Sequence, residues 1–166
     1  MAQPPVTYDD GSIVIELRCV GGEAPGPTLA QKVGPLGIPA KVVGEDIKKA
    51  TMDFLGLKVN VRLIIKDRKA RIELIPNSAT LILKALREPP RDRKKEKNIT
   101  HHGSITMTDV VEVARAIKPK SKCNEFAGVI KSVLGTCVSI GCTIEGRNPK
   151  EVIGDIAAGR IRCPTE

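Results

Sequence analysis

Aromatic side chains are nearly absent from this chain of 166 residues, which has two phenylalanines, one tyrosine and no tryptophan. Modules that bind single-stranded nucleic acid stack bases on aromatic rings, and each stack contributes roughly 1–3 kcal/mol. Tyr8, Phe54 and Phe126 are scattered along the chain and cannot form such a platform. If the partner is a nucleic acid, we expect recognition through backbone, 2′-hydroxyl groups and shape, as in folded or double-stranded RNA.

Closely spaced metal ligands are also scarce. The chain has five cysteines and no CxxC pair, and Cys137 and Cys142 have four residues between them. The only histidines are His101 and His102. A zinc site needs closely spaced ligand pairs. We therefore expect no metal, no cofactor and reduced thiols, which are typical of a cytosolic protein.

Long apolar runs and enzyme motifs are missing too. No apolar run reaches the ~20 residues that span a bilayer, and MAQPPVTYDD lacks the basic start and apolar core of a secretory signal, so no membrane partner is expected. The glycines of GGEAPGP precede no GK[ST] ending, and no Ser or Cys lies in a nucleophile motif. His101 and His102 lie in a polar segment with no evident orienting carboxylate, so we predict no catalytic residue, and an enzyme using them is the weakest hypothesis.

Positive charge, by contrast, is plentiful. The formal net charge of +8 favours an anionic partner. Between positions 84 and 97, seven basic residues face three acidic ones; the basic ones are Lys84, Arg87, Arg91, Arg93, Lys94, Lys95 and Lys97. Pro89 and Pro90 stiffen the start of this basic segment. It is interpreted either as an RNA contact or as a solvated linker or nuclear-localisation patch.

The first half of the chain has strand-like alternation. Residues 13–20, 58–66 and 70–75 each place apolar side chains on alternate positions, and the last two form a hairpin across KDRK. The residues expected to point inward are Ile13, Ile15, Leu17, Cys19, Val59, Val61, Leu63, Ile65, Ala70, Ile72 and Leu74. A helix opened by Pro39 and capped near Gly56 is predicted to cover this sheet. Its expected buried face is Val42, Val43, Ile47, Ala50, Thr51 and Phe54.

Residues 21–39, GGEAPGPTLAQKVGPLGIP, are dense in Gly and Pro. Such a segment is expected to form neither an ordinary helix nor a strand. Two interpretations remain open: a long surface loop, or a preformed turn-rich surface that binds a partner.

The second half, from Pro76 on, has helical periodicity. The predicted helices begin at an Asn77 or Ser78 cap, at a Thr108 or Asp109 cap, near residue 124 and at an Asn148 cap. Pro119 is expected to end the second of them. We therefore predict an α+β protein. Residues 1–75 form a small α+β domain with a three-stranded antiparallel sheet, and residues 76–166 form an all-helical RNA-binding domain.

The predicted helix at 124–140 carries two stripes. Apolar residues are expected to pack inward; they are Phe126, Ile130, Val133, Leu134, Cys137 and Ile140. The other stripe is small or polar, namely Gly128, Ser132, Gly135, Thr136 and Ser139. Each interior glycine costs roughly 0.8–1.0 kcal/mol relative to alanine. The small stripe suits either close helix packing or a shallow RNA minor groove, where hydroxyls reach 2′-hydroxyl groups.

Three long stretches resemble one family. They are VGGEAPGPTLAQKVGPLGIPAKVVGEDI, REPPRDRKKEKN with HHGSIT, and SVLGTCVSIGCTIEGRNPKEVIGDIAAG. In this order, and over roughly residues 13–161, the chain resembles the universal large-subunit ribosomal protein numbered eleven in bacteria and twelve in eukaryotes. PPRDRKK and NPKEVIGDI resemble its eukaryotic and archaeal branch.

The resemblance implies a structural, non-enzymatic constituent of the large ribosomal subunit. The C-terminal domain would bind folded rRNA of the GTPase-associated centre at the stalk base. The N-terminal domain would face translational GTPases (elongation factors) beside the acidic stalk proteins and support factor action. The implied location is the cytoplasmic large subunit and, in a eukaryote, the nucleolus during assembly.

The family's functional positions carry over as follows. The implied RNA-binding residues are Arg91, Arg93, Lys94, Lys95, Lys97, Gly135, Thr136, Ser139, Ile140 and Gly141. The implied factor-facing residues are Pro25, Pro27, Gly34, Pro35, Leu36 and Gly37. A Lys/Arg run supplies affinity without selecting one RNA fold, so we expect selection to lie near Gly135. The rival hypothesis is a protein-interaction adaptor whose Pro/Gly segment binds a partner while the basic segment serves nuclear import.

Overall fold

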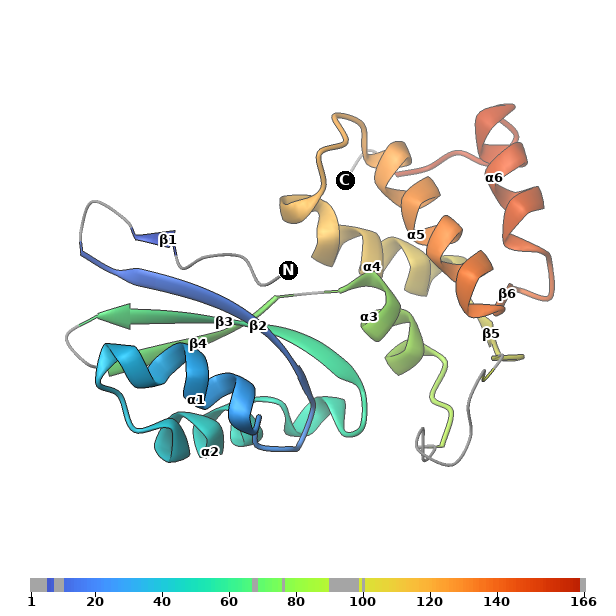
Figure 1. Ribbon diagram of the computed structural model, residues 1–166. Helices are drawn as coiled ribbons and strands as arrows, with labels where there is room; N and C mark the ends of the chain where they lie inside the picture. The colour runs from blue at the N-terminus through green and yellow to red at the C-terminus, as the bar shows by residue number, and fades with distance from the viewer. Residues whose placement is uncertain are drawn as a thin grey trace. The chain divides into compact units, whose positions relative to one another are not determined.

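The computed structural model describes residues 6–7, 11–66, 69–75, 77–89, 99 and 101–164. The chain divides into two compact units, Met1–Ile75 and Pro76–Glu166 (Figure 1). Each unit has a hydrophobic core of its own.

An antiparallel sheet forms the first unit. Its strand order is β1-β2-β3-β4, and the strands are β1 (Val6–Thr7), β2 (Ile13–Val20), β3 (Lys58–Lys66) and β4 (Lys69–Ile75). Ile15 pairs with Leu63, and Leu63 pairs with Ile72. The three long strands and their hairpin are confirmed. The two-residue β1 was not predicted.

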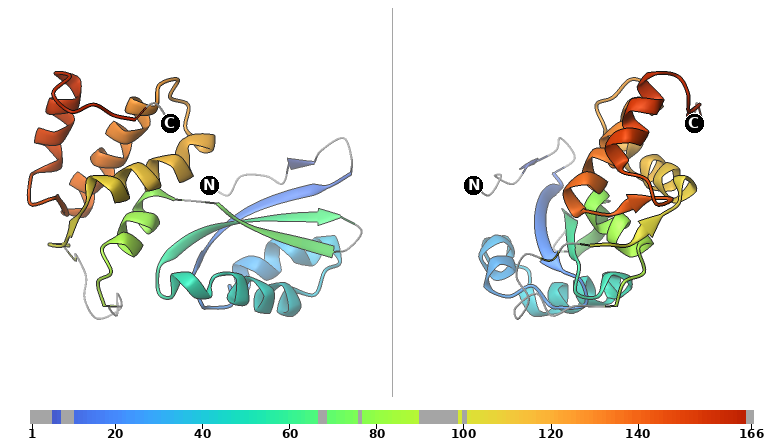
Figure 2. Two further views of the ribbon diagram at one scale, coloured as in Figure 1. Left: turned by 180° about the vertical axis from the view of Figure 1, so that it is seen from behind. Right: turned by 90° about the vertical axis from the view of Figure 1, so that its right-hand side faces the viewer.

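Two helices cover one face of this sheet (Figures 1 and 2). They are α1 (Pro27–Val33) and α2 (Ala40–Ala50), each followed by a single 3₁₀ turn, η1 (Gly34–Leu36) and η2 (Met52–Phe54). Leu29 of α1 and Ile47 of α2 are buried against the strand residues Val61 and Leu63. The helices therefore supply the apolar cover that the sheet requires.

Helix α1 contradicts the expectation that residues 21–39 hold no helix. Pro27 lies in the first turn, where the missing N–H would have had no helical partner. The following residues TLAQKV contain no further proline, and Leu29 and Val33 lie four residues apart on the buried face. Proline counts were misleading here because position, not number, decides whether a helix forms.

Several other details of the first unit were predicted wrongly. Pro39 precedes α2 as its cap, and Val42, in the first turn, is 55% exposed. The helix ends at Ala50, so Gly56 follows η2 and caps no α-helix. Leu74, predicted to point inward, is 39% exposed. It is the penultimate residue of β4, which has a strand neighbour on one side only.

Four helices form the second unit. They are α3 (Ser78–Ala85), α4 (Met107–Ile117), α5 (Phe126–Ile140) and α6 (Pro149–Ala157). Helix α5 packs against the other three (Figure 1). Ile130, Leu134 and Cys137 on its inner face are fully buried, as predicted, whereas Ile140 is only partly buried. Among the described helices, none has the length and apolarity needed to cross a membrane.

The observed cap of α4 differs from the predicted one. Helix α4 is capped by Thr106, two residues before the expected position, and Asp109 completes a capping box by accepting from the Thr106 backbone N–H. The Thr-x-x-Asp spacing contained this signal. Asn148 caps α6 as predicted, accepting from Lys150 N at 3.0 Å.

A short parallel pairing also departs from the all-helical expectation. Strands β5 (Ser104–Ile105) and β6 (Thr143–Ile144) pair in parallel. Their main effect is to join the segment before α4 to the segment after α5.

Candidate RNA interface

The outer face of α5 is open at three of the predicted small positions. Ser132, Gly135 and Ser139 are exposed, and a Cβ added at Gly135 would meet no atom within 4 Å. The Ser139 hydroxyl donates to Thr136 O at 2.7 Å. A hydroxyl that donates inward keeps its lone pairs as acceptors. This face therefore offers close approach and acceptors to a partner such as a 2′-hydroxyl.

Gly128 and Thr136 behave differently from the rest of the small stripe. A Cβ at Gly128 would lie 3.4 Å from Cys123 Cβ, an ordinary contact distance, so this position faces the segment before α5 and not open space. Thr136 is partly buried; its hydroxyl donates to Ser132 O at 3.2 Å and lies 3.4 Å from Ser78 Oγ of α3. The open face of α5 is thus narrower than the stripe read from the sequence.

The C-terminal end of α5 holds the segment that follows the basic one. Gly141 has φ +94 and caps the helix, with its N–H donating to Cys137 O at 2.9 Å. A Cβ there would lie 3.2 Å from His101 O. His101 N donates to Ile140 O at 3.3 Å. Ile140 and Gly141 therefore contact the chain beside the basic segment, and glycine is needed for both conformation and space.

The two flanks of the basic segment are joined to each other. Glu88 Oε2 lies 2.5 Å from His101 Nδ1, and their side chains are only 18% and 16% exposed. A Cβ at Gly103 would lie 2.6 Å from Leu86 Cδ2, so Leu86 packs directly on this glycine. The expectation that His101 has no orienting carboxylate is wrong, because the partner Glu88 comes from the other flank.

The structure describes only some of the residues of the basic segment. Arg91, Arg93, Lys94, Lys95 and Lys97 lie outside the described residues. The structure describes the two flanks of the basic segment, which are joined by Glu88 and His101 and lie beside Ile140 and Gly141. We call this joined pair of flanks the stem. Their assignment to RNA stays a prediction, as does that of the α5 residues.

The pairing of β5 with β6 fixes the same region from the other side. Thr143 N donates to Gly103 O at 3.0 Å, and Glu145 N donates to Ile105 O at 3.0 Å. The Glu145 carboxylate accepts from Met107 N at 3.0 Å, at the start of α4. Neither the sequence period nor any motif indicated this framework, since two-residue strands leave no pattern.

The described thiols and acidic side chains do not cluster into a metal site. No group of three or more His, Cys, Asp or Glu side chains within the described part of the chain is placed to hold a metal ion. A hydrogen bond with Cys142, together with burial, raises the pKa of the Cys137 thiol. Such a thiol is a poor nucleophile at neutral pH.

The predicted factor-facing residues lie at the two ends of α1. Pro25 and Pro27 precede or begin this helix, and Gly34–Leu36 and Gly37 follow it. Pro27 and Pro35 are exposed, whereas Leu36 packs against the core of the first unit. Six helical residues lie between Pro27 and Gly34, which places the two groups about 10 Å apart along the helix. They accordingly form two turns at opposite ends of α1, and Leu36 attaches the second turn to the core of the first unit.

Comparison with known proteins identifies two adjoining segments. Residues 15–70 match the family model of ribosomal protein L11, N-terminal domain. Residues 74–144 match ribosomal protein L11, RNA binding domain. Helix α6 begins at Pro149, after the second matched segment ends.

Curated relatives match over nearly the whole chain. Large ribosomal subunit protein uL11 of Encephalitozoon cuniculi is 59% identical over 159 residues, covering 95% of this chain and 96% of the relative. The uL11 protein of Caenorhabditis elegans and uL11A of Schizosaccharomyces pombe are each 47% identical over 164 residues, covering 98% of this chain and 99% of the relative. These eukaryotic relatives confirm the resemblance inferred from the three stretches. The chain is therefore a ribosomal protein of the large subunit and not an enzyme. It belongs to the ribosomal protein L11 family and carries that family's RNA-binding domain.

Proposed function

We propose that the C-terminal unit binds the folded rRNA of the GTPase-associated centre at the stalk base, and that the N-terminal unit supports the action of translational GTPases. The observation that carries the proposal is the stem at Glu88 and His101. It holds the flanks of the basic segment beside the C-terminal end of α5. The described flanks of the basic segment and the C-terminal end of α5 therefore lie together, which supports a shared interface.

The two parts of this interface would act differently. The basic segment attracts phosphates, with counterion release supplying affinity without sequence or shape preference. The face at Ser132, Gly135 and Ser139 is exposed and carries no bulky side chain. A shallow RNA minor groove can approach such a surface closely and donate 2′-hydroxyls to the serine oxygens. Shape selection therefore belongs to α5.

The N-terminal unit would meet the elongation factors through the turns at both ends of α1, with the acidic stalk proteins beside it. Support comes from the exposure of Pro27, which begins α1, and of Pro35 in the following turn η1. The helix between them is anchored by Leu29 and Val33. Exposed turns on a rigid scaffold often carry binding functions. In a eukaryotic cell the protein would enter the subunit during nucleolar assembly.

RNA binding is tested with the full-length chain and a transcript of the rRNA segment from the GTPase-associated centre. We expect salt-dependent binding to the Mg²⁺-folded transcript, and binding weaker by at least tenfold to the same transcript kept unfolded without Mg²⁺. Equal affinity for both forms would show that only charge acts and would favour the adaptor hypothesis.

The factor-facing role is tested separately. Replacing Pro25 and Pro27 by Ala should leave rRNA affinity unchanged and lower factor-dependent GTP hydrolysis on ribosomes reconstituted with the variant. Pro119→Ala, an exposed proline in the other unit, is the matched control. A normal rate for the Pro25 and Pro27 variant would remove the proposed role.

A further inference from the structure

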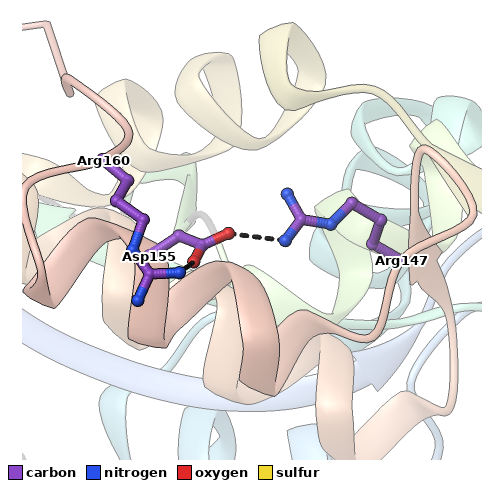
Figure 3. A network of polar contacts seen from close by, with 3 residues as sticks. All are labelled: Arg147, Asp155 and Arg160. Carbon is purple, nitrogen blue, oxygen red and sulfur yellow. Dashed lines mark hydrogen bonds and ion pairs between the residues drawn. The ribbon is translucent and has the colours of Figure 1, made fainter.

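Two arginines converge on one carboxylate of α6 (Figure 3). Arg147 Nη2 lies 2.5 Å from Asp155 Oδ2, and Arg160 Nη1 lies 3.1 Å from Asp155 Oδ1. The Asp155 side chain is 16% exposed, whereas those of Arg147 and Arg160 are 50% and 74% exposed. A guanidinium has five N–H donors, so each arginine can bind a second anion while it keeps Asp155.

The backbone at both arginines is fixed. Arg147 N donates to Ile144 O at 2.8 Å, and Ile144 N donates to Arg147 O at 3.0 Å, which closes a tight turn through Glu145 (φ +51). Arg160 follows the end of α6, and its N–H donates to Asp155 O at 2.9 Å. The backbone is thus fixed at both residues, and Asp155 holds both guanidinium groups, which lowers the entropic cost of binding a ligand.

The position of α6 in its unit does not depend on both arginines. The helix already has the Asn148 cap, and Val152 and Ile156 bury its inner face. Exposed ion pairs stabilise proteins little. One arginine would suffice to neutralise Asp155, so the N–H groups of the second remain available to an anionic ligand.

The arginine pair adjoins the candidate RNA interface. The turn that carries Arg147 is held by Gly146 N donating to Ser104 Oγ at 3.2 Å and by the Glu145 N–H bond to Ile105 O. These contacts connect the Arg147 turn to Ser104 and Ile105. Ser104 lies three residues after His101 of the stem. Helix α6 also packs along α5 (Figures 1 and 2). An RNA seated at the end of α5 is therefore within reach of α6.

The chemistry of the pair indicates a phosphate. Asp155 and Glu151 both act electrostatically on Arg147, so diffuse attraction of any polyanion is weak here. Arginine recognises phosphate oxygens through paired N–H groups. These directional hydrogen bonds can still form when nearby carboxylates neutralise part of the arginine charge. We propose that Arg147 and Arg160, held by Asp155, form a phosphate-binding site that extends the rRNA interface onto α6, outside the segment matched by the family's RNA-binding domain. This inference rests on the proposed rRNA binding of the C-terminal unit.

The test measures the salt dependence of binding by the full-length chain to the Mg²⁺-folded rRNA transcript. Each phosphate contact contributes roughly 0.7–0.9 to the slope of log K against log salt concentration. We expect Arg147→Gln and Arg160→Gln each to weaken binding roughly threefold to tenfold at low salt, and the double variant to lower the slope by about one contact. Lys41→Gln, which removes one exposed charge from the N-terminal unit, should leave the slope unchanged.

Arg147→Lys separates bidentate recognition from charge. It should weaken binding while it keeps the wild-type slope. A wild-type slope for the double glutamine variant would overturn the inference, including the case in which affinity falls only because α6 is loosened, and would favour an acidic protein as the ligand of the pair. If the unmodified chain fails to prefer the folded transcript, the proposed function itself fails, which is a distinct outcome.

Discussion

Glu88 and His101 lie thirteen residues apart in sequence, yet Glu88 Oε2 is 2.5 Å from His101 Nδ1. The pair joins the two flanks of the basic segment. Because this contact is already made in the free protein, ordering the two flanks adds less entropic cost when a ligand binds. In the proposed interface the pair would therefore act by positioning, since neither residue supplies the basic charge.

The first prediction concerns this pair. In a double-mutant cycle of Glu88→Ala and His101→Ala, we expect a coupling free energy of about 0.5–1.5 kcal/mol, since a largely buried hydrogen bond joins the side chains. Both single variants should also weaken rRNA binding without changing its salt slope. Urea unfolding and RNA titration measure the two effects. His102→Ala, an exposed neighbour, is the control, and additive single effects would show that the contact contributes nothing.

The elements that follow a local period were predictable. Strict alternation along residues 13–20 and 58–66 predicted β2 and β3, and the 3–4 spacing of Phe126, Ile130 and Val133 predicted the buried face of α5. In each case burial of one face decides the structure, and the sequence records that face directly.

What was missed depends on position or on distant partners. Helix α1 was hidden because Pro27 was counted as a breaker, although it lies in the first turn. The contact between Glu88 and His101, and the pairing of Ser104 with Thr143, join residues far apart in sequence. No periodicity encodes such contacts, so the stem that organises the candidate site came only from the structure.

The second prediction is a pH-dependent cap on α4. Hydrogen bonds from the Thr106 side chain and backbone lower the pKa of Asp109 below its ordinary value of 3.8. The unfolded chain therefore binds this proton more readily, and the cap stabilises the fold fully above that value and loses its effect as pH falls through the lower, folded pKa. Asp109→Asn should destabilise the protein at neutral pH, and its difference from wild type should shrink as the pH falls through the lowered pKa of Asp109.

Thr106→Ala supplies the matched variant for this cap. It should cost about 1 kcal/mol, typical of a lost N-cap side chain, and urea unfolding across pH measures both variants. A difference for Asp109→Asn that stays constant from neutral to acid pH would show that the carboxylate charge plays no part.

The third prediction concerns Thr51, which is fully buried behind the sheet. Its hydroxyl donates to Ile47 O at 2.8 Å and accepts from Gly22 N at 3.1 Å. Thr51→Val keeps the volume but leaves the Gly22 N–H without this acceptor, which should cost about 1–3 kcal/mol. Hydrogen exchange of β3 amides reports the loss. Thr28→Val, an exposed position on α1, should change stability by less than about 0.5 kcal/mol, and equal effects at both positions would contradict the buried role.

The fourth prediction separates stability from binding at the open face of α5. Gly135→Leu places a large side chain where a Cβ meets nothing within 4 Å, so the fold accommodates it. Because an interior glycine costs roughly 0.8–1.0 kcal/mol relative to alanine, and leucine is nearly as good a helix former, the variant should be more stable than wild type. Its affinity for the folded rRNA transcript should nevertheless fall by about tenfold or more, since the groove can no longer approach the backbone.

Ala116→Leu controls for added bulk, because Ala116 is an exposed position on α4 of the same unit. It should leave RNA affinity within about twofold of wild type, a change under 0.5 kcal/mol. A stabilised Gly135→Leu protein that binds the transcript as well as wild type would show that this face is merely solvent-exposed. Opposite movements of stability and affinity cannot arise from partial unfolding, so they would assign Gly135 to the RNA interface.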